Sequence, residues 1–226
     1  MLDARLALAA ELYQPCSTGA DVGTDHGLLP CHLLEQGVCE QMILTDVSPK
    51  ALARARTEVC KRHLESRTHL VCGDGLEALD APCGCISITG MGGRTIAGIL
   101  HRGQEKLRGA ALVLCAHTEQ AEARQALQEI GYRLQREEPC LCNGHAYLVW
   151  LAVPGEMQLQ PMEMLCGREL FSSKSPMLRP YLQHRLATLQ RRLDGLVRAS
   201  RQDHEAITRT RAVMDYYLQK AEESIP

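Results

Sequence analysis

The feature that most constrains the fold is a repeated change of hydrophobic period over residues 1–155. Apolar runs typical of strands lie at 19–23, 42–46, 68–72, 85–89 and 111–115, and helical patterns lie at 28–36, 49–64 and 119–130. Strands that alternate with helices predict a mostly parallel sheet covered on both faces. Two more strands, at 132–137 and 145–153, follow without a long helix between them. They predict an antiparallel hairpin at the edge of the sheet.

The chain changes character after Pro154-Gly155, where the strand patterns stop. Two sets of residues with helical spacing follow, which predicts two helices packed as a hairpin or coiled coil. The bend between them is expected at Gly195 or within 199–202. We therefore expect an α/β domain at 1–155 and an α-helical domain at 156–226. The spaced residues are Leu178, Leu182, Leu186, Leu189, Leu193 and Leu196 in the first helix and Ile207, Arg211, Met214 and Leu218 in the second.

The formal charge divides along the same boundary. The whole chain has a formal charge of −2, with 14 basic and 18 acidic residues in 1–155 and 11 basic and 9 acidic residues in 156–226. Residues 168–211 alone hold 10 basic and 4 acidic side chains. This basic arm has two equally weighted interpretations, a phosphate-binding surface or the solvated face of a helical pair.

Nothing in the composition indicates a secreted, metal-bound or membrane protein. The N-terminus lacks a signal peptide, and no apolar run approaches the roughly 18 residues of a membrane helix. We expect a cytoplasmic protein whose eleven cysteines are free thiols. Two Cys-x-Cys pairs, Cys83/Cys85 and Cys140/Cys142, are closer than zinc ligands usually lie, so no metal is expected. Instead, Cys85 is expected to face inward on a strand, with Cys83 at its start.

The first strand ends in a turn typical of cofactor binding, Asp-Val-Gly-Thr-Asp-His-Gly at residues 21–27. Glycine lets the backbone bend sharply and approach a ligand, and the helix start that follows favours an anionic group. The turn lacks the Gly-x-Gly-x-x-Gly pattern of dinucleotide-binding proteins. Asp21 would repel a pyrophosphate but would suit the ammonium of a bound methionine group. The turn therefore favours S-adenosylmethionine (SAM) over NAD.

Three further motifs follow the next three strands. Asp46 has the spacing of a carboxylate that grips ribose hydroxyls, although it would also serve as a helix cap. Gly-Asp-Gly at 73–75 would let Asp74 accept from an adenine amine, or would form an ordinary turn. Gly-Met-Gly-Gly at 90–93 suggests close approach of the backbone to cofactor and substrate. The predicted cofactor residues are Asp21, Gly23, Thr24, Asp46, Val47, Gly73, Asp74, Gly75, Gly90, Met91 and Gly92.

Together these motifs resemble the bacterial tRNA adenine(22)-N1 methyltransferase family. The resemblance rests on residues 21–26 with Leu29-Pro30, on 73–76, on 90–93 and on Gly131-Tyr132, and it extends to the C-terminal helices. It implies a Rossmann-like SAM-binding domain and a coiled-coil domain that helps to hold tRNA. It also implies methylation of adenine N1, with S-adenosylhomocysteine as the product.

The chain departs from the family pattern at two places. Where the family typically carries Gln-Pro-Asn after the fifth strand, at a position that faces the substrate pocket, this chain has Ala116-His117-Thr118. A Phe-Gly-Pro-like segment of the C-terminal domain is replaced by Cys166-Gly167-Arg168. The resemblance therefore identifies the cofactor more firmly than the acceptor.

Methylated adenine carries a positive charge, so a carboxylate near the acceptor would stabilise it or take a proton from the exocyclic amine. Asp25 is the candidate, because it lies in the cofactor turn beyond Asp21. His26 would orient Asp25 or simply pack at the helix start. His117 is the candidate to replace part of the missing Gln-Pro-Asn function.

Three alternatives remain open to the sequence. The first is a SAM methyltransferase acting on a small molecule or protein, and the second is a non-catalytic RNA-binding homologue. The third, an NAD enzyme, is disfavoured by the first turn. The partner expected is tRNA, with no membrane. The oligomeric state is left open, a monomer being the simplest arrangement.

Overall fold

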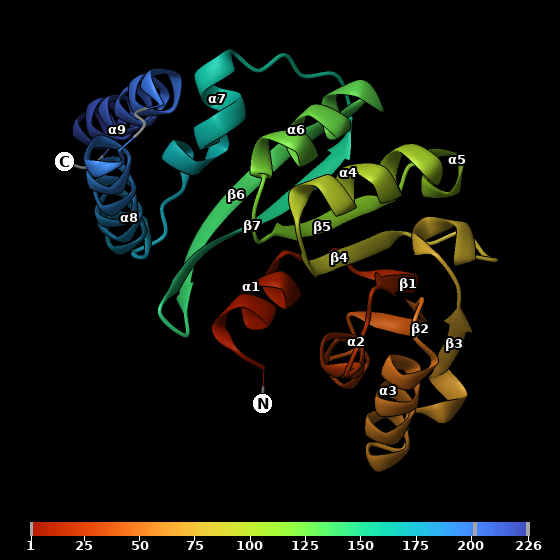
Figure 1. Cartoon of the computed structure of the whole chain (residues 1–226). Coiled ribbons are helices and arrows are strands. Elements are labelled where there is room, and N and C mark those ends of the chain that lie inside the picture. Colours follow the sequence, from red (N-terminus) through yellow and green to blue (C-terminus); the bar gives the residue numbers. More distant parts are fainter. Residues whose placement is uncertain (1, 201–202, 225–226) are drawn as a thin grey trace.

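A computed structural model describes residues 2–200 and 203–224, which contain a seven-stranded sheet in the order β3-β2-β1-β4-β5-β7-β6 (Figure 1). Strands β1 to β5 are parallel to one another, as the alternating pattern predicts. The strands are β1 Cys16–Val22, β2 Cys39–Asp46, β3 Thr68–Cys72, β4 Cys85–Met91, β5 Ala111–Ala116, β6 Tyr132–Cys142 and β7 His145–Pro154.

The predicted hairpin is confirmed at one edge of the sheet. Strand β7 is antiparallel to both β5 and β6, so β6 forms the outer edge. Strand β6 runs five residues beyond the predicted end at residue 137 and includes Pro139. A proline is tolerated there because an edge strand does not need every backbone N–H for pairing.

Side chains alternate between two cores on the two faces of the sheet. On β5, Leu112 and Leu114 pack in one core, and Val113 and Cys115 pack in the other. Figure 1 shows α1, α2 and α3 on one face and α4, α5 and α6 on the other. The helices are α1 Ala4–Leu12, α2 Leu28–Glu35, α3 Pro49–Lys61, α4 Gly93–Arg102, α5 Gln104–Leu107 and α6 Gln120–Glu129, with short 3-10 turns η1 Glu65–Arg67 and η2 Gly75–Ala78.

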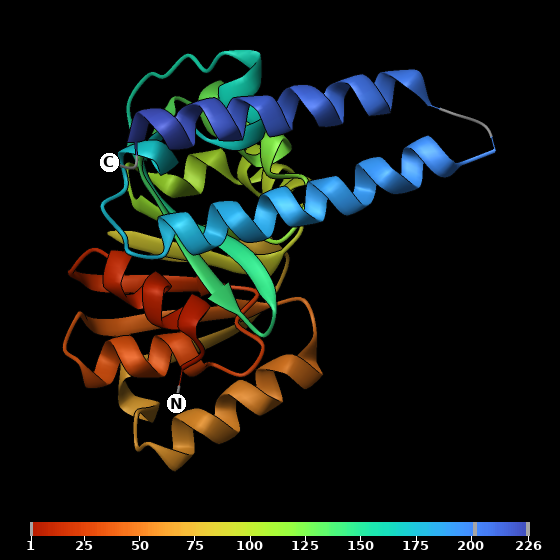
Figure 2. The ribbon, with the colours of Figure 1, turned by 90° about the vertical axis from the view of Figure 1, so that its left-hand side faces the viewer.

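The C-terminal part is helical, as predicted. It consists of α7 Pro161–Cys166, the 3-10 turn η3 Glu169–Ser172, α8 Leu178–Arg198 and α9 His204–Ser224. Figure 2 shows α8 and α9 side by side, projecting beyond the sheet. Gly195 lies inside α8, so the bend falls after Arg198, partly outside the described residues. No helix within 2–200 and 203–224 is long and apolar enough to cross a membrane.

The inward stripe of α9 differs from the predicted one. Arg211 is exposed and Leu218 is 48% exposed, whereas Thr210 and Tyr217 are buried. The aromatic ring of Tyr217 packs against Phe171 of η3, so α9 is oriented by η3 as well as by α8. The heptad pattern predicts which residues of α9 face α8, but it does not take the contact of α9 with η3 into account.

A buried ion pair joins the helical part to the sheet. Arg124 of α6 donates to Glu137 of β6 through Nε at 2.9 Å and Nη2 at 2.6 Å, and both side chains are fully buried. The other Glu137 oxygen accepts from the backbone N–H of Glu169 at 3.0 Å. Gly167 lies against this pair, with φ of +91° and no room for a Cβ. The pair therefore connects α6, β6 and η3.

Candidate functional site

Two adjoining cavities lie at the carboxyl ends of the parallel strands, where ligands bind in α/β sheets. One has a volume of about 400 Å³ and the other about 240 Å³, and Gly23, Asp46 and Met91 line both. A larger cavity of about 470 Å³ lies near Gln41 and His69, closer to the amino ends of the strands. We take the adjoining pair as the candidate site, because the predicted motifs converge there.

Asp21 is a buried carboxylate in the larger of the two cavities, which we call the acceptor cavity after the methyl acceptor that the sequence motifs lead us to expect there. It lies near the end of β1, and the Ser87 hydroxyl of β4 donates to its Oδ1 at 2.6 Å. Burial raises the pKa of Asp21 above its ordinary value, and the Ser87 hydrogen bond offsets part of this rise. A cationic ligand group beside Asp21 would favour its ionised form.

The turn after β1 is held by the neighbouring strand. The backbone N–H groups of Gly23 and Thr24 both donate to the Thr45 carbonyl of β2, at 2.8 and 3.0 Å. Gly23 has φ of +74°, and a Cβ there would overlap the Met91 methyl. The Met91 side chain therefore lies over Gly23, between the two cavities.

Asp46 and Val47 follow β2 beside this turn. Asp46 accepts from the backbone N–H of Asp25 at 3.3 Å and of Ser48 at 2.9 Å. The helix α3 is capped by Ser48, whose hydroxyl accepts from the Ala51 N–H at 3.3 Å, so Asp46 is not the helix cap. Val47 is 66% exposed and lines the smaller cavity, which we call the adenosine cavity after the part of SAM that the sequence motifs lead us to expect there. An exposed apolar side chain at a cavity wall suits a flat ligand ring.

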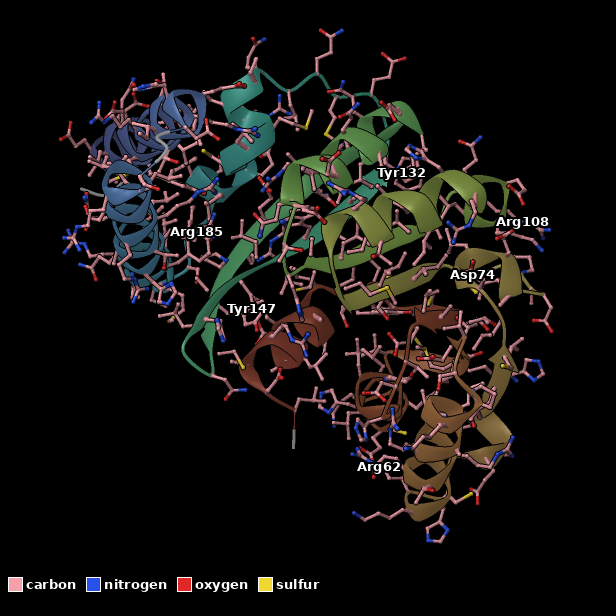
Figure 3. All side chains as sticks on the ribbon, viewed as in Figure 1. Arg62, Asp74, Arg108, Tyr132, Tyr147 and Arg185 are labelled. Carbon is pink, nitrogen blue, oxygen red and sulfur yellow. The ribbon has the colours of Figure 1, made fainter. Side chains whose placement is uncertain are left out.

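The Gly-Asp-Gly turn forms the far wall of the adenosine cavity. Gly73 N–H donates to the Asp46 carbonyl at 3.1 Å, which joins the two turns. Asp74 is paired with Arg102 of α4, whose Nη2 donates at 2.9 Å. Figure 3 shows Asp74 near the end of β3, well apart from Tyr147 near α1.

The glycine run after β4 has a mixed role. Gly90 has φ of +83° at a break in the pairing of β4 with β5, and Gly90 and Met91 line the acceptor cavity. Gly92 caps α4 and lines neither cavity, lying instead close to the Thr118 hydroxyl. Gly93 packs directly on the backbone of Glu119. Part of the glycine content therefore serves packing.

Asp25 and His26 lie at the mouth of the acceptor cavity. Asp25 has left-handed backbone geometry, and its side chain is 52% exposed. Arg54 of α3 donates to Asp25 Oδ1 through Nε at 3.0 Å, and His26 Nε2 lies 3.5 Å from Oδ2. The carboxylate therefore has a cationic partner of its own.

His117 also lines the acceptor cavity, and it contacts two residues that were not predicted from the sequence. Arg5 of α1 places Nη1 2.7 Å from His117 Nε2. The guanidinium also lies over the Tyr147 ring of β7, 5.7 Å from its centre. Burial, and then the nearby Arg5 charge, lower the pKa of His117 below its ordinary value.

A basic groove adjoins the acceptor cavity at His117. It has a volume of about 380 Å³ and runs between the loop after β5 and helices α8 and α9. Its cationic side chains are Arg185, Arg192 and Arg209. Its acidic residues are Glu119, which is paired with Arg94 at 2.9 Å, and Glu122. Among the residues that the structure describes, only His117 lines both the groove and the acceptor cavity.

The structure thus brings the predicted site residues to one edge of the sheet, apart from Gly92. The acceptor cavity holds Asp21, Gly23, Thr24, Asp25, His26, Asp46, Gly90, Met91 and His117, and the adenosine cavity adds Val47, Gly73, Asp74 and Gly75.

The cysteines lie outside this site, and all eleven carry free thiols. Cys85 is buried on β4 with Cys83 just before the strand, as predicted. Within residues 2–200 and 203–224, no three His, Cys, Asp or Glu side chains come together as metal ligands would.

Comparison with known proteins places this geometry in a family. A family model described as a methyltransferase domain matches residues 2–150. The tRNA (adenine(22)-N(1))-methyltransferase of Bacillus subtilis is 32% identical over 157 residues, which are 69% of this chain and 66% of that protein.

Solved structures extend the similarity to the C-terminal helices. The B. subtilis M1A22 tRNA methyltransferase TrmK is 25% identical, with 97% of this chain and 98% of that chain covered and a TM-score of 0.81. A Streptococcus pneumoniae protein solved in complex with S-adenosyl-L-methionine is 26% identical over the whole of both chains, with a TM-score of 0.80. The chain therefore belongs to the methyltransferase domain family and, within it, to the class I methyltransferases that include TrmK.

Proposed function

We propose that this protein transfers a methyl group from SAM to N1 of an adenine in tRNA, at position 22 by family resemblance. The observation that carries the proposal is the joined pair of cavities at the carboxyl ends of β1 to β4. The similarity to TrmK over nearly the whole chain supports the same acceptor. The protein would act in the cytoplasm, where tRNA is modified.

The residues present fit SAM. Exposed Val47 and the apolar wall of the adenosine cavity suit an adenine ring, and Asp46 beside them suits ribose hydroxyls. Buried Asp21 suits the ammonium of the methionine part. SAM supplies an activated methyl group on a sulfonium. The protein's own task is chiefly to align the acceptor nitrogen with that methyl.

The acceptor adenine must leave any base pair, because pairing blocks N1; flipping it costs a few kcal/mol. The acceptor cavity, which is lined by Asp25, His26 and His117, is proposed to receive the base. Asp25 is proposed to stabilise the charge that develops on the methylated base. His26, 3.5 Å from the Asp25 carboxylate, is proposed to orient it.

The C-terminal helices are proposed to hold the tRNA. We assign this task to residues 156–226, and within them to the basic groove next to His117. Phosphate groups bind to arginines through charge and paired hydrogen bonds. A strand whose base entered the acceptor cavity would leave its neighbouring phosphates near this groove.

The test combines purified protein, tritiated SAM and unmodified tRNA transcripts, followed by mapping of the labelled nucleotide. We expect SAM binding and label at adenine N1. Absence of SAM binding would remove the central claim. Binding without RNA labelling, but with label on a small molecule or protein, would favour a different acceptor. Salt-dependent tRNA binding without transfer would favour a non-catalytic homologue.

The variant Asp25→Ala should retain SAM binding and lose transfer, since Asp25 lies at the cavity mouth and not in the adenosine cavity. Arg54→Gln is the matched control, because it removes the partner of Asp25 without removing the carboxylate. Unchanged turnover in Asp25→Ala would take Asp25 out of the mechanism.

A further inference from the structure

The N-terminal helix α1 contributes a cation to the acceptor cavity. The Arg5 side chain is 17% exposed and lines the cavity together with Asp3 and Leu6 of the same segment. Its Nη1 lies 2.7 Å from His117 Nε2, although the two residues are 112 positions apart in the sequence. The contact is therefore a product of the tertiary fold.

Arg5 is held in place from several sides. Asp3 lies 3.5 Å from Nη2, and the other oxygen of Asp3 is fixed by the Leu6 N–H at 2.8 Å. The Tyr147 ring lies beneath the guanidinium and edge-on to the His117 ring, with the two ring centres 5.0 Å apart. The His117 backbone N–H donates to the Met91 carbonyl at 2.9 Å. Both partners in the contact are thus pre-positioned.

The contact determines where the imidazole carries its proton. A guanidinium has only donors, so His117 Nε2 must accept with its lone pair. The neutral imidazole then carries its proton on Nδ1. No group among the described residues has a hydrogen bond to Nδ1, and His117 lines both the acceptor cavity and the basic groove, so one N–H remains available to a ligand.

We propose that Arg5 is a positioning residue that holds His117 as the Nδ1-protonated neutral tautomer, so that Nδ1–H donates to a ring nitrogen of the acceptor adenine. The inference rests on the proposed function. Adenine offers N7 and N3 as acceptors that remain free when N1 faces the methyl group. A donor of this kind selects a purine placed in one orientation, because a wrongly turned ring leaves the N–H unpaired.

Several other charges face His117, and they determine its response to pH. They are Arg5 of α1, Asp3 at its N-cap and His145 of β7, while Asp25 and His26 line the same cavity. Arg5 and burial both favour the neutral ring. Loss of Arg5 should therefore raise the pKa of His117 and allow Nε2 to carry a proton.

The first experiment measures the tautomer and the pH profile. Nitrogen-15 NMR of the unliganded protein should show His117 protonated at Nδ1, with Arg5→Met giving a mixture of tautomers. In Arg5→Met, kcat/KM for RNA should fall severalfold more at pH 6 than at pH 8, because a raised His117 pKa lets Nε2 take up a proton at the lower pH. Arg5→Lys keeps the cation and should recover most of the loss at low pH.

The controls separate this role from a structural one. SAM affinity should be unchanged in both Arg5 variants, and Arg56→Met on the exposed face of α3 should change nothing. A uniform loss at every pH, or a wild-type His117 protonated at Nε2, would overturn the proposal. The NMR result does not depend on activity, so its failure is distinguishable from failure of the proposed methylation.

The second experiment removes the acceptor atom. RNA carrying 7-deazaadenosine or 3-deazaadenosine at the target keeps N1 but loses one ring nitrogen. We expect one analogue to lower kcat/KM about 10-fold in the wild type, the cost of one lost hydrogen bond. The same analogue should have little effect in His117→Ala. Equal activity on both analogues and adenosine would refute the hydrogen bond.

Discussion

Gly93 is the residue near the site whose size is most directly limited by packing. A Cβ at this position would overlap the Glu119 carbonyl, which is backbone and cannot rotate away. We expect Gly93→Ala to lower the free energy of unfolding by roughly 3 kcal/mol, the upper part of the usual overpacking range. Urea unfolding measures this change.

The matched control is Gly195→Ala, where no atom lies within 4 Å of the added Cβ. Because Gly195 is inside α8, alanine there should stabilise the protein by about 0.5–1 kcal/mol. Equal effects of the two substitutions would contradict the packing account of Gly93.

Asp21 is expected to bind the ammonium group of SAM, but its buried charge lowers the stability of the unliganded fold. Its folded-state pKa is raised above the unfolded value, so the unliganded fold loses stability as pH rises from the ordinary Asp range through the raised value. At neutral pH, Asp21→Asn should therefore raise the melting temperature by about 2–4 °C, or about 1 kcal/mol for a chain of this size.

The same substitution should abolish SAM binding, because the amide cannot balance an ammonium group. Wild-type affinity for SAM should also fall on acidification at a pH above the ordinary Asp range, as Asp21 takes up a proton. Calorimetric titration at several pH values tests this, with exposed Asp215→Asn as the control. A less stable Asp21→Asn protein, or one that still binds SAM, would count against this role.

At the scale of single residues, the sequence predicts the expected cofactor side of the site well. Asp21, Asp46 and Asp74 lie at or just after the ends of successive strands, and topology brings strand ends together. Arg5 and Tyr147 were not predicted, because each reaches His117 from a distant element. Their alignment depends on how α1 and β7 pack, which no local spacing encodes.

Among the secondary-structure elements, the buried Arg124–Glu137 pair is one connection between the sheet and the C-terminal helices, through the Glu169 N–H. Arg124→Met would leave the Glu137 charge buried without its cation, and we expect a loss of about 3–5 kcal/mol. Adding Glu137→Gln should restore part of it, since an amide oxygen still accepts from the Glu169 N–H. Denaturant unfolding of both variants measures the difference.

The control is Arg136→Met on the same strand. Arg136 pairs with Glu138 at 2.7 Å but is about half exposed, so its loss should cost less than about 1 kcal/mol. A similar loss in Arg124→Met and Arg136→Met would show that burial of the pair is unimportant.

The elements differ in how far the sequence predicts them. Strand β3 is predicted to the residue, whereas the cap of α3 is Ser48 and not Asp46. Helices α1, α4, α5 and α7 were not predicted. Helix α4 begins at Gly93, with Gly92 as its N-cap. Glycine is a poor helix former, so the sequence alone does not predict a helix here. The close packing of Gly93 on the Glu119 backbone explains why glycine stands at this position. Tertiary contact outweighs local preference there.

On the scale of the whole molecule, the part of the chain that forms the sheet is acidic and the helical arm is basic. The groove between them should therefore determine how strongly tRNA binding depends on salt. Arg192→Gln/Arg209→Gln removes two groove cations, so the slope of log affinity for tRNA against log salt should become shallower by about 1.5–2. SAM affinity should remain unchanged. Filter binding from low to high salt measures the slope.

Arg56→Gln/Arg108→Gln removes two exposed arginines away from the groove, and its slope should match the wild type. If both double variants lower the slope equally, tRNA contacts are spread over the surface and not gathered in the groove.

The hydrophobic core that the sheet shares with the arm would limit the transfer of the arm to another protein. Tyr181 and Tyr217 of the arm are buried in one cluster with Trp150 of the sheet, and Glu137 of β6 anchors η3. A transplant of the arm onto another methyltransferase would have to carry matching residues on the recipient's last two strands. The arm and the hairpin should therefore diversify together during evolution, as one inherited unit.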